Sequence, residues 1–172
     1  MAHIAVVVLG DTGRSPRMQY HALSFANLNE TNRVSLIGYK GEQCIESINT
    51  HEKINDIRIN NTIELPFLLN KIPMLSAIWK GISILFSILY TLAITIPYYD
   101  SILIQNPPAL PALLAALIIE LLPGRNSIII LDWHNLGFAM FQEKYDGNKK
   151  HPLVVLSKFL EYICCNFIDI HL

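Results

Sequence analysis

The fold is decided by His3-Ile4-Ala5-Val6-Val7-Val8-Leu9 and the segment that follows it, Gly10-Asp11-Thr12-Gly13-Arg14-Ser15-Pro16-Arg17. An apolar, β-branched run without polar alternation is typical of a strand buried on both faces, as in a parallel sheet. The run stops at Gly10, and a short polar loop follows. Ser15 and Pro16 are residue types preferred at the N-cap and first position of a helix. The segment therefore predicts a strand, a loop and a helix of an α/β fold.

Segments typical of strands and helices alternate along the rest of the chain. Further strands are expected at 33–38, 57–65, 100–105, 126–132 and 167–172. Helices are expected at 18–29, 111–122 and 151–166 and within the apolar segment 72–99, and short helices in the loops 39–55 and 137–150. This order predicts a single Rossmann-like domain over residues 1–172, with a parallel sheet, right-handed crossovers and helices on both faces.

The composition narrows the class of protein. The net charge is −1, so the chain has no broad basic surface for nucleic acid. Hydrophobic residues make up 52% and charged residues 16% of the chain, against typical values of roughly 45–50% and about 25%. This excess predicts extra buried surface or contact with a membrane. The three cysteines have neither metal-ligand nor disulfide spacing, and Cys164 and Cys165 are expected to be small apolar helix residues.

The apolar segment 81–96 contains no charged side chain. About 18 uncharged residues are needed for a membrane span, so this segment lies at the threshold. It also lies where a strand–helix–strand fold needs a crossover helix, which favours a buried or membrane-surface helix over a span. Lys71 and Lys80, at its N-terminal edge, would suit contact with lipid headgroups.

Polar segments follow the first, fourth and fifth expected strands, at 10–17, 105–108 and 132–135. Ligands of open parallel sheets bind beyond the carboxyl ends of the strands. We therefore expect the three segments to converge on one edge of the sheet and to form a binding site there.

The first segment has the features of an anion site. Gly10 and Gly13 allow tight turns and the close approach of another group. Arg14, Ser15 and Arg17 stand at the expected helix start, where free N–H groups and guanidinium groups favour phosphate. The alternative is that the glycines only shape the turn and the arginines are only solvated. The spacing differs from G-x-G-x-x-G, so no dinucleotide fingerprint is present.

His134 and Asp11 are the candidates for catalysis. Because histidine titrates near neutrality, His134 is a candidate general base; alternatively, it orders its loop through backbone hydrogen bonds. Asp132 is expected to orient His134 or to cap the next turn. Asp11 either accepts hydrogen bonds from the hydroxyl groups of a ligand or caps the loop amides.

Amide and aromatic side chains at the same edge are candidates for ligand binding. Gln105, Asn106 and Asn135 offer hydrogen-bond donors and acceptors. Trp133 either stacks on a sugar ring or packs in the core. The chain contains no Ser-His-Asp order, zinc signature, Walker loop or D-x-D motif, so no metal site is expected.

The segment Leu9–Ser24, followed by Gln105-Asn106-Pro107-Pro108 and Asp132-Trp133-His134-Asn135, resembles the chitobiosyldiphosphodolichol β-mannosyltransferase family. The resemblance covers essentially the whole chain and corresponds to the N-terminal half of such an enzyme. It implies the first of two Rossmann-like domains of a GT-B glycosyltransferase. That domain would handle the acceptor, N,N′-diacetylchitobiosyl diphosphodolichol (GlcNAc2-diphosphodolichol), at the cytosolic face of the endoplasmic reticulum membrane. The implied reaction adds a β-1,4-linked mannose with inversion. In it His134 would take the proton of a sugar hydroxyl and Asp11 would accept from acceptor hydroxyls, while the amide side chains named above would bind a sugar.

The resemblance also implies parts that these 172 residues lack, namely an N-terminal membrane anchor and a C-terminal donor domain for GDP-mannose. We therefore expect the chain alone to be inactive. No cofactor is expected besides the donor substrate, and the missing D-x-D motif agrees with metal-independent glycosyltransferases of this class. Expected partners are the acceptor, the membrane surface and other early glycosyltransferases of lipid-linked oligosaccharide synthesis for N-glycosylation.

Two other classes of function stay open. A non-catalytic, membrane-associated module would bind the acceptor without turnover, or would pair with a full-length transferase. A nucleotide-binding oxidoreductase domain fits the α/β pattern, but it lacks the glycine spacing and has Gly38-Tyr39-Lys40 where an acidic residue would end the second strand. A dinucleotide titration separates this last class from the others.

Overall fold

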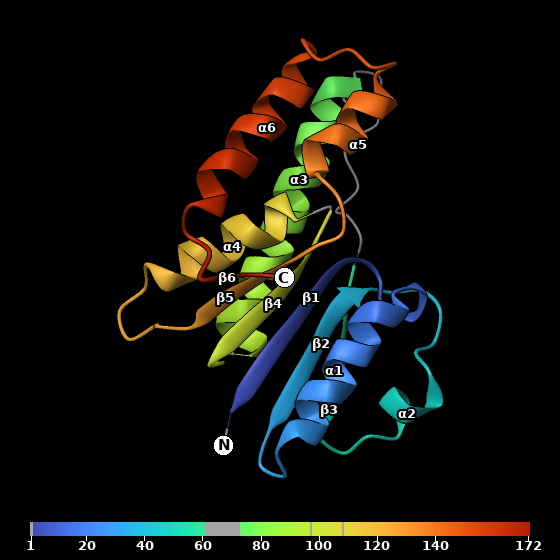
Figure 1. Cartoon of the computed structure of the whole chain (residues 1–172), viewed down its shortest axis with the longest axis vertical. Helices are drawn as coiled ribbons and strands as arrows, with labels where there is room; N and C mark the ends of the chain where they lie inside the picture. Colours follow the sequence, from blue (N-terminus) through green and yellow to red (C-terminus); the bar gives the residue numbers. More distant parts are fainter. Residues whose placement is uncertain (1, 61–72, 97, 108) are drawn as a thin grey trace.

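The computed structural model describes residues 2–60, 73–96, 98–107 and 109–172. Its strands form one parallel, six-stranded sheet in the order β3-β2-β1-β4-β5-β6 (Figure 1). They are β1 (His3–Asp11), β2 (Arg33–Tyr39), β3 (Ile54–Ile59), β4 (Ser101–Asn106), β5 (Ile128–Trp133) and β6 (Ile170–His171). The predicted Rossmann-like α/β class is confirmed.

Helices cover both faces of the sheet (Figure 1). One face carries α1 (Pro16–Leu28) and α2 (Glu46–Asn49). The other carries α3 (Pro73–Tyr90), which continues into a π-helical segment (Thr91–Thr95), and α4 (Leu110–Glu120). On that side α6 (Pro152–Cys165) packs against α4, and α5 (Gly137–Lys144) packs against α6.

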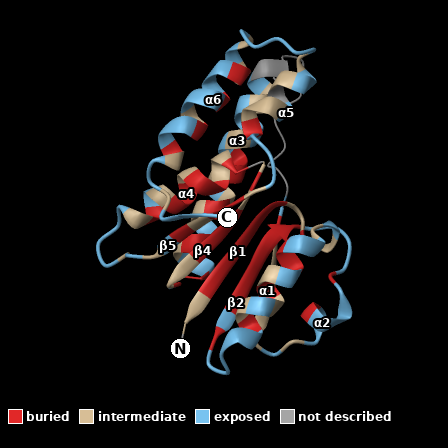
Figure 2. Cartoon of the chain, viewed as in Figure 1, coloured by how far each residue is buried: buried red, intermediate tan, exposed pale blue. Residues whose placement is uncertain are grey.

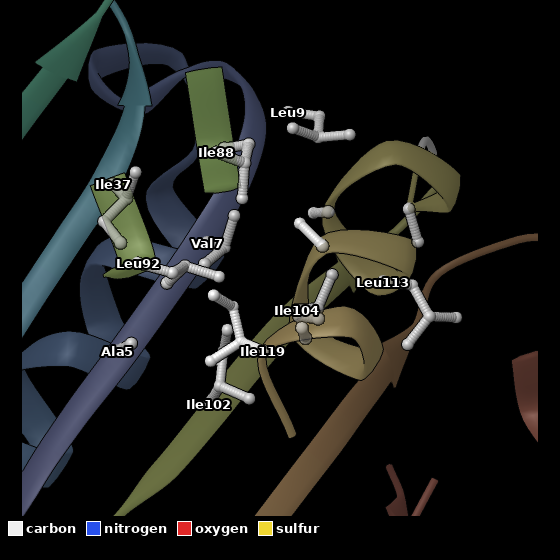
Figure 3. Close-up of a cluster of buried hydrophobic side chains, with 14 of the residues drawn as sticks. Ala5, Val7, Leu9, Ile37, Ile88, Leu92, Ile102, Ile104, Leu113 and Ile119 are labelled. Atoms are coloured by element: carbon white, nitrogen blue, oxygen red, sulfur yellow. The ribbon is translucent and has the colours of Figure 1, made fainter. Parts of the chain in front are cut away.

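Strand β1 lies at the centre of the sheet, and both of its faces are buried (Figure 2). Ala5 and Val7 join the cluster under α3 and α4, with Ile88, Leu92 and Ile104 among its members (Figure 3). Val6 and Val8 join the cluster under α1. Because successive side chains of a strand point to opposite faces, burial of both faces explains the unbroken apolar run.

The third strand differs from its predicted bounds of 57–65. Strand β3 begins at Ile54, and residues 61–65 lie outside the described residues. Ile54 packs toward the α1 side and Ile57 toward the α3 side, as the alternation of a strand requires. The start was missed because β3 is an edge strand, so its intervening Asn55 and Asp56 remain partly or fully exposed.

The apolar segment forms the predicted crossover helix between β3 and β4. Leu75–Thr95 is long and apolar enough to span a membrane, with a mean hydropathy of 1.8. However, Ile84, Ile88 and Leu92 are buried against the sheet. This packing favours the predicted buried or surface helix over a span. Lys71 lies outside the described residues.

Candidate functional site

The three polar segments meet at the carboxyl edge of the sheet. They follow β1, β4 and β5, which are neighbouring parallel strands. The backbone N–H of His134 donates to the carbonyl oxygen of Asn106 at 2.8 Å, which joins the loops after β4 and β5. Arg17 forms an ion pair with Asp132 and joins the first segment to the third. The predicted convergence is confirmed.

The first loop is held by the Asp11 carboxylate. Its Oδ1 accepts a hydrogen bond from the Gly13 amide at 2.9 Å, and its Oδ2 accepts one from the Glu42 amide at 2.9 Å. A Cβ atom on Gly13 would lie 2.3 Å from the carbonyl oxygen of Glu42, so a glycine is required where these two loops cross. The capping interpretation of Asp11 is confirmed, and its catalytic role stays a prediction.

The same contacts lower the pKa of Asp11 below its usual value. The hydrogen bond from the Glu42 amide is the main cause, and partial burial opposes it. The Gly13 amide and the guanidinium groups of Arg58 and Arg14, at 3.5 and 3.8 Å, lower the pKa further. Asp11 is therefore an ionised hydrogen-bond acceptor and a weak acceptor of protons.

Both arginines of the predicted anion site have carboxylate partners. The side chain of Arg14 is 74% exposed, and its Nη2 lies 3.4 Å from Oε1 of Glu42. Arg17 is half-exposed and pairs with buried Asp132. Ser15 occupies the N-cap position of α1, but its side chain makes no capping hydrogen bond. The site therefore presents two guanidinium groups already oriented by acids.

Asp132 does not orient His134, contrary to one sequence-based expectation. Its side chain is fully buried on the α1 side of β5, where Oδ1 accepts from Arg17 and Oδ2 lies 3.6 Å from Nε2 of His21. His134 lies two residues later in the loop, with an exposed side chain. The partner was missed because Arg17 and Asp132 are 115 residues apart in the sequence.

A buried acid supports the loops after β4 and β5. Glu161 of α6 accepts hydrogen bonds from Nδ2 of Asn106 and the Gly137 amide, both at 2.9 Å, and from the Phe138 amide at 3.1 Å. Asn106 also donates to the carbonyl oxygen of Asn135 at 3.2 Å. The side-chain amide of Asn106 therefore connects the loops at this edge to α6. Sequence reasoning missed Glu161, although a single acid in an apolar helix is a usable signal.

The remaining predicted residues lie at the rim. Nε1 of Trp133 donates to Nδ1 of His171 at 2.9 Å, and the two rings stack with centroids 6.0 Å apart. Trp133 thus packs against His171 at the rim, and its stacking on a sugar ring stays a prediction. Gln105 is half-buried, and Oδ1 of Asn135 accepts from the Leu136 amide at 2.8 Å. Among the described ranges, no group of three His, Cys, Asp or Glu side chains has a metal-binding arrangement.

No protein-family model matches the chain. It is 35% identical over 170 residues to the chitobiosyldiphosphodolichol β-mannosyltransferase of Dictyostelium discoideum, and 38% identical over 174 residues to that of Debaryomyces hansenii. It is 32% identical over 164 residues to that of Mus musculus. These alignments cover 94%, 96% and 92% of the chain. The chain is a homologue of these β-mannosyltransferases. It spans about a third of their length, between 31% and 34%.

A solved structure shares the fold of this β-mannosyltransferase homologue. It is a putative UDP-N-acetylglucosamine 2-epimerase from Listeria monocytogenes, with a TM-score of 0.57 and 13% identity. The similarity covers 98% of this chain and 38% of the epimerase chain. At this identity the likeness concerns the fold alone, and it agrees with the Rossmann-like sheet.

Replacing Gly13 with alanine will destabilise the domain by about 1–3 kcal/mol, the usual cost of overpacking. The new Cβ atom would lie 2.3 Å from a backbone oxygen, so one of the two loops must move. Urea denaturation followed by circular dichroism measures the change. Gly10→Ala is the control, because its Cβ would meet only Val8 Cγ1 at 3.6 Å. Equal stability of the two variants would contradict the close packing of the Gly13 loop against the backbone of Glu42.

Arg17→Ala will lower the free energy of unfolding by about 2 kcal/mol. Removing one partner of a fully buried pair costs about 3–5 kcal/mol, and exposure of Arg17 reduces that cost. Arg14→Ala is the matched control, with a change below about 0.5 kcal/mol because its ion pairs are exposed. Urea denaturation again measures the change. A larger effect at Arg14 would refute the conclusion that the Arg17–Asp132 pair stabilises the domain more than the exposed ion pairs of Arg14.

Asp11→Asn will flatten the acid side of the stability profile. The pKa of Asp11 is lowered in the folded state, so its contribution is fully present above the unfolded value near 3.9. That contribution is lost as the pH falls through the lower, folded value. Melting temperatures between pH 6 and pH ~2 should therefore show the variant less stable at pH 6 and the two proteins converging in acid. Parallel plots of melting temperature against pH would show that ionisation of Asp11 does not contribute to the stability of the fold.

Proposed function

We propose that this chain supplies the acceptor-binding domain of a GT-B β-mannosyltransferase. The reaction would transfer mannose from GDP-mannose to GlcNAc2-diphosphodolichol in lipid-linked oligosaccharide synthesis, at the cytosolic face of the endoplasmic reticulum membrane. The observation that carries the proposal is the homology, which extends over more than nine-tenths of the chain to proteins with this name. Because the chain spans about a third of those proteins, GDP-mannose is proposed to bind mainly through residues outside it.

The carboxyl edge of the sheet is the proposed acceptor site. Arg14 and Arg17 would share their guanidinium groups between their present carboxylate partners and the acceptor diphosphate. Trp133, His134 and Asn135 line the neighbouring rim of the same edge and would contact the chitobiose. The support for this arrangement is that the cations and the sugar-binding residue types lie on loops joined by direct contacts.

His134 is the proposed general base. Its backbone is anchored to Asn106, and its exposed imidazole extends from the carboxyl edge. In the proposed step, the 4-hydroxyl oxygen of the terminal acceptor sugar bonds to C1 of mannose, and its proton passes to the imidazole. The C1–O bond to GDP breaks, and GDP leaves with the electron pair on the face opposite the new bond. Asp11 would orient the first loop and accept a hydrogen bond from the acceptor.

A chimera tests the activity. The matching third of the Dictyostelium discoideum relative is replaced by this chain, and transfer of radiolabelled mannose to a chitobiosyl diphosphate lipid is measured. We expect activity in the chimera, and a loss of about 100-fold or more for His134→Ala because general-base catalysis typically contributes 10²–10⁴-fold. His51→Ala is the control, since His51 lies three residues before β3 begins, at the amino edge of the sheet, opposite the candidate site.

The outcomes separate the functional classes. The purified chain alone should bind the chitobiosyl diphosphate lipid in a titration without transferring mannose. Acceptor binding together with an inactive, folded chimera would favour the non-catalytic module. Failure to bind the acceptor would contradict the proposed site. If His134→Ala and His51→Ala had equal effects, the role of His134 would be refuted.

A further inference from the structure

Helix α3 is apolar on two opposite sides. Its inner side, with Ile84, Ile88 and Leu92 of the following segment, is 0–7% exposed and covers the sheet. Its outer side carries large apolar residues at helical spacing, and each of them is 38–64% exposed. These residues are Leu75, Ile78, Trp79, Ile82, Phe86 and Tyr90. We call these six residues the outer stripe. A surface helix of a soluble domain ordinarily carries polar residues there, so the outer stripe indicates a partner.

The helices beside α3 extend this apolar surface. Helix α4 packs against both α3 and α6, and Leu121 at its C-terminal end is 84% exposed. On α6, Phe159 and Tyr162 are also exposed. On the opposite face of the sheet, α1 exposes Tyr20 and Leu28 as its large apolar residues. Exposed apolar side chains are therefore concentrated on one layer of the molecule.

The charges on this layer distinguish between possible partners. Within the described parts of α3, α4 and α6, the exposed charged side chains are Lys80 and Lys158. The acids are engaged within the domain, since half-buried Glu120 bonds Ser127 and buried Glu161 bonds the loops after β4 and β5. The exposed charges of these three helices are positive, which complements an anionic lipid surface, while the neighbouring α5 exposes one acid and one base, Glu143 and Lys144. Trp79 and Tyr90 add rings of the type enriched at the membrane–water interface.

We propose that the outer stripe of α3 binds the surface of an anionic lipid bilayer, with the helix parallel to the membrane plane. A span would require Ile84, Ile88 and Leu92 to leave the sheet and would uncover the core. Since α3 connects parallel strands β3 and β4, it runs back along the sheet from the carboxyl edge. The end near Leu75 therefore lies on the same side of the domain as the candidate site. This inference does not depend on the proposed activity.

Vesicle flotation of the purified chain tests the proposal. The probe is vesicles of phosphatidylcholine and phosphatidylserine without any dolichol-linked sugar, so acceptor recognition plays no part. We expect the chain to float with the vesicles, and Phe86→Asp to weaken binding about tenfold or more through loss of one buried aromatic ring. Leu28→Asp is the matched control, because Leu28 is 78% exposed on the opposite layer. Its binding should equal that of the unmodified chain.

The depth of Trp79 tests the orientation. In a Trp133→Phe variant, Trp79 is the remaining tryptophan, and lipids brominated at different acyl positions report its depth. Strongest quenching near the headgroups supports a helix lying on the surface, and strongest quenching at the bilayer centre overturns it. Circular dichroism confirms that each variant is folded. Absence of vesicle binding, equal loss in the two aspartate variants, or a dimer in sedimentation that Phe86→Asp dissociates would each overturn the proposal.

Discussion

Both faces of strand β1 are buried along Ala5–Val8, and the arrangement of the other elements depends on this burial. Side chains of this run point alternately to two apolar clusters, so the chain must place helices on both faces of the sheet. The central position of β1 then brings its carboxyl end between the ends of β2 and β4. A loop that leaves a sheet at this point is crowded by its neighbours. The glycine at position 13 is the local consequence of that crowding.

Acidic side chains give the carboxyl edge its shape. Asp11 fixes the crossing of two loops, Asp132 ties β5 to α1, and Glu161 gathers the segments after β4 and β5. A carboxylate removed from water must be matched by a cation or by several hydrogen-bond donors, so each acid specifies the position of its partners. Exposed Arg14 and His134 extend from this framework. Such support holds the candidate residues in place while their own polar groups stay accessible to solvent.

The sequence was sufficient to predict the architecture and the edge of the sheet at which the candidate residues meet. Apolar runs bounded by Gly, Pro and polar residues locate the four inner strands β1, β2, β4 and β5 closely, because burial on both faces leaves a local pattern. Edge strand β6 was predicted at 167–172 but covers only Ile170–His171, both of which are exposed. Edge strand β3 breaks that pattern and was misplaced at its start. The partners of Asp132 and Asn106 could not be predicted, because they come from helices far away in the sequence. Residue types show which groups gather at an edge, but tertiary packing decides which of them face solvent.

The contacts of Glu161 also limit how this chain can diverge. A Cβ atom at Gly137 would lie 3.4 Å from both carboxylate oxygens of Glu161 and 3.5 Å from Oδ1 of Asn106. A shorter acid at 161 or a non-donor at 106 would each remove a hydrogen bond from this buried cluster, and a side chain longer than alanine at 137 would extend from a Cβ already in van der Waals contact with it. Substitutions at the three positions should thus be correlated among homologues. Their order of appearance in a lineage would be constrained as well, because an intermediate that changes 106 or 161 alone loses a buried hydrogen bond.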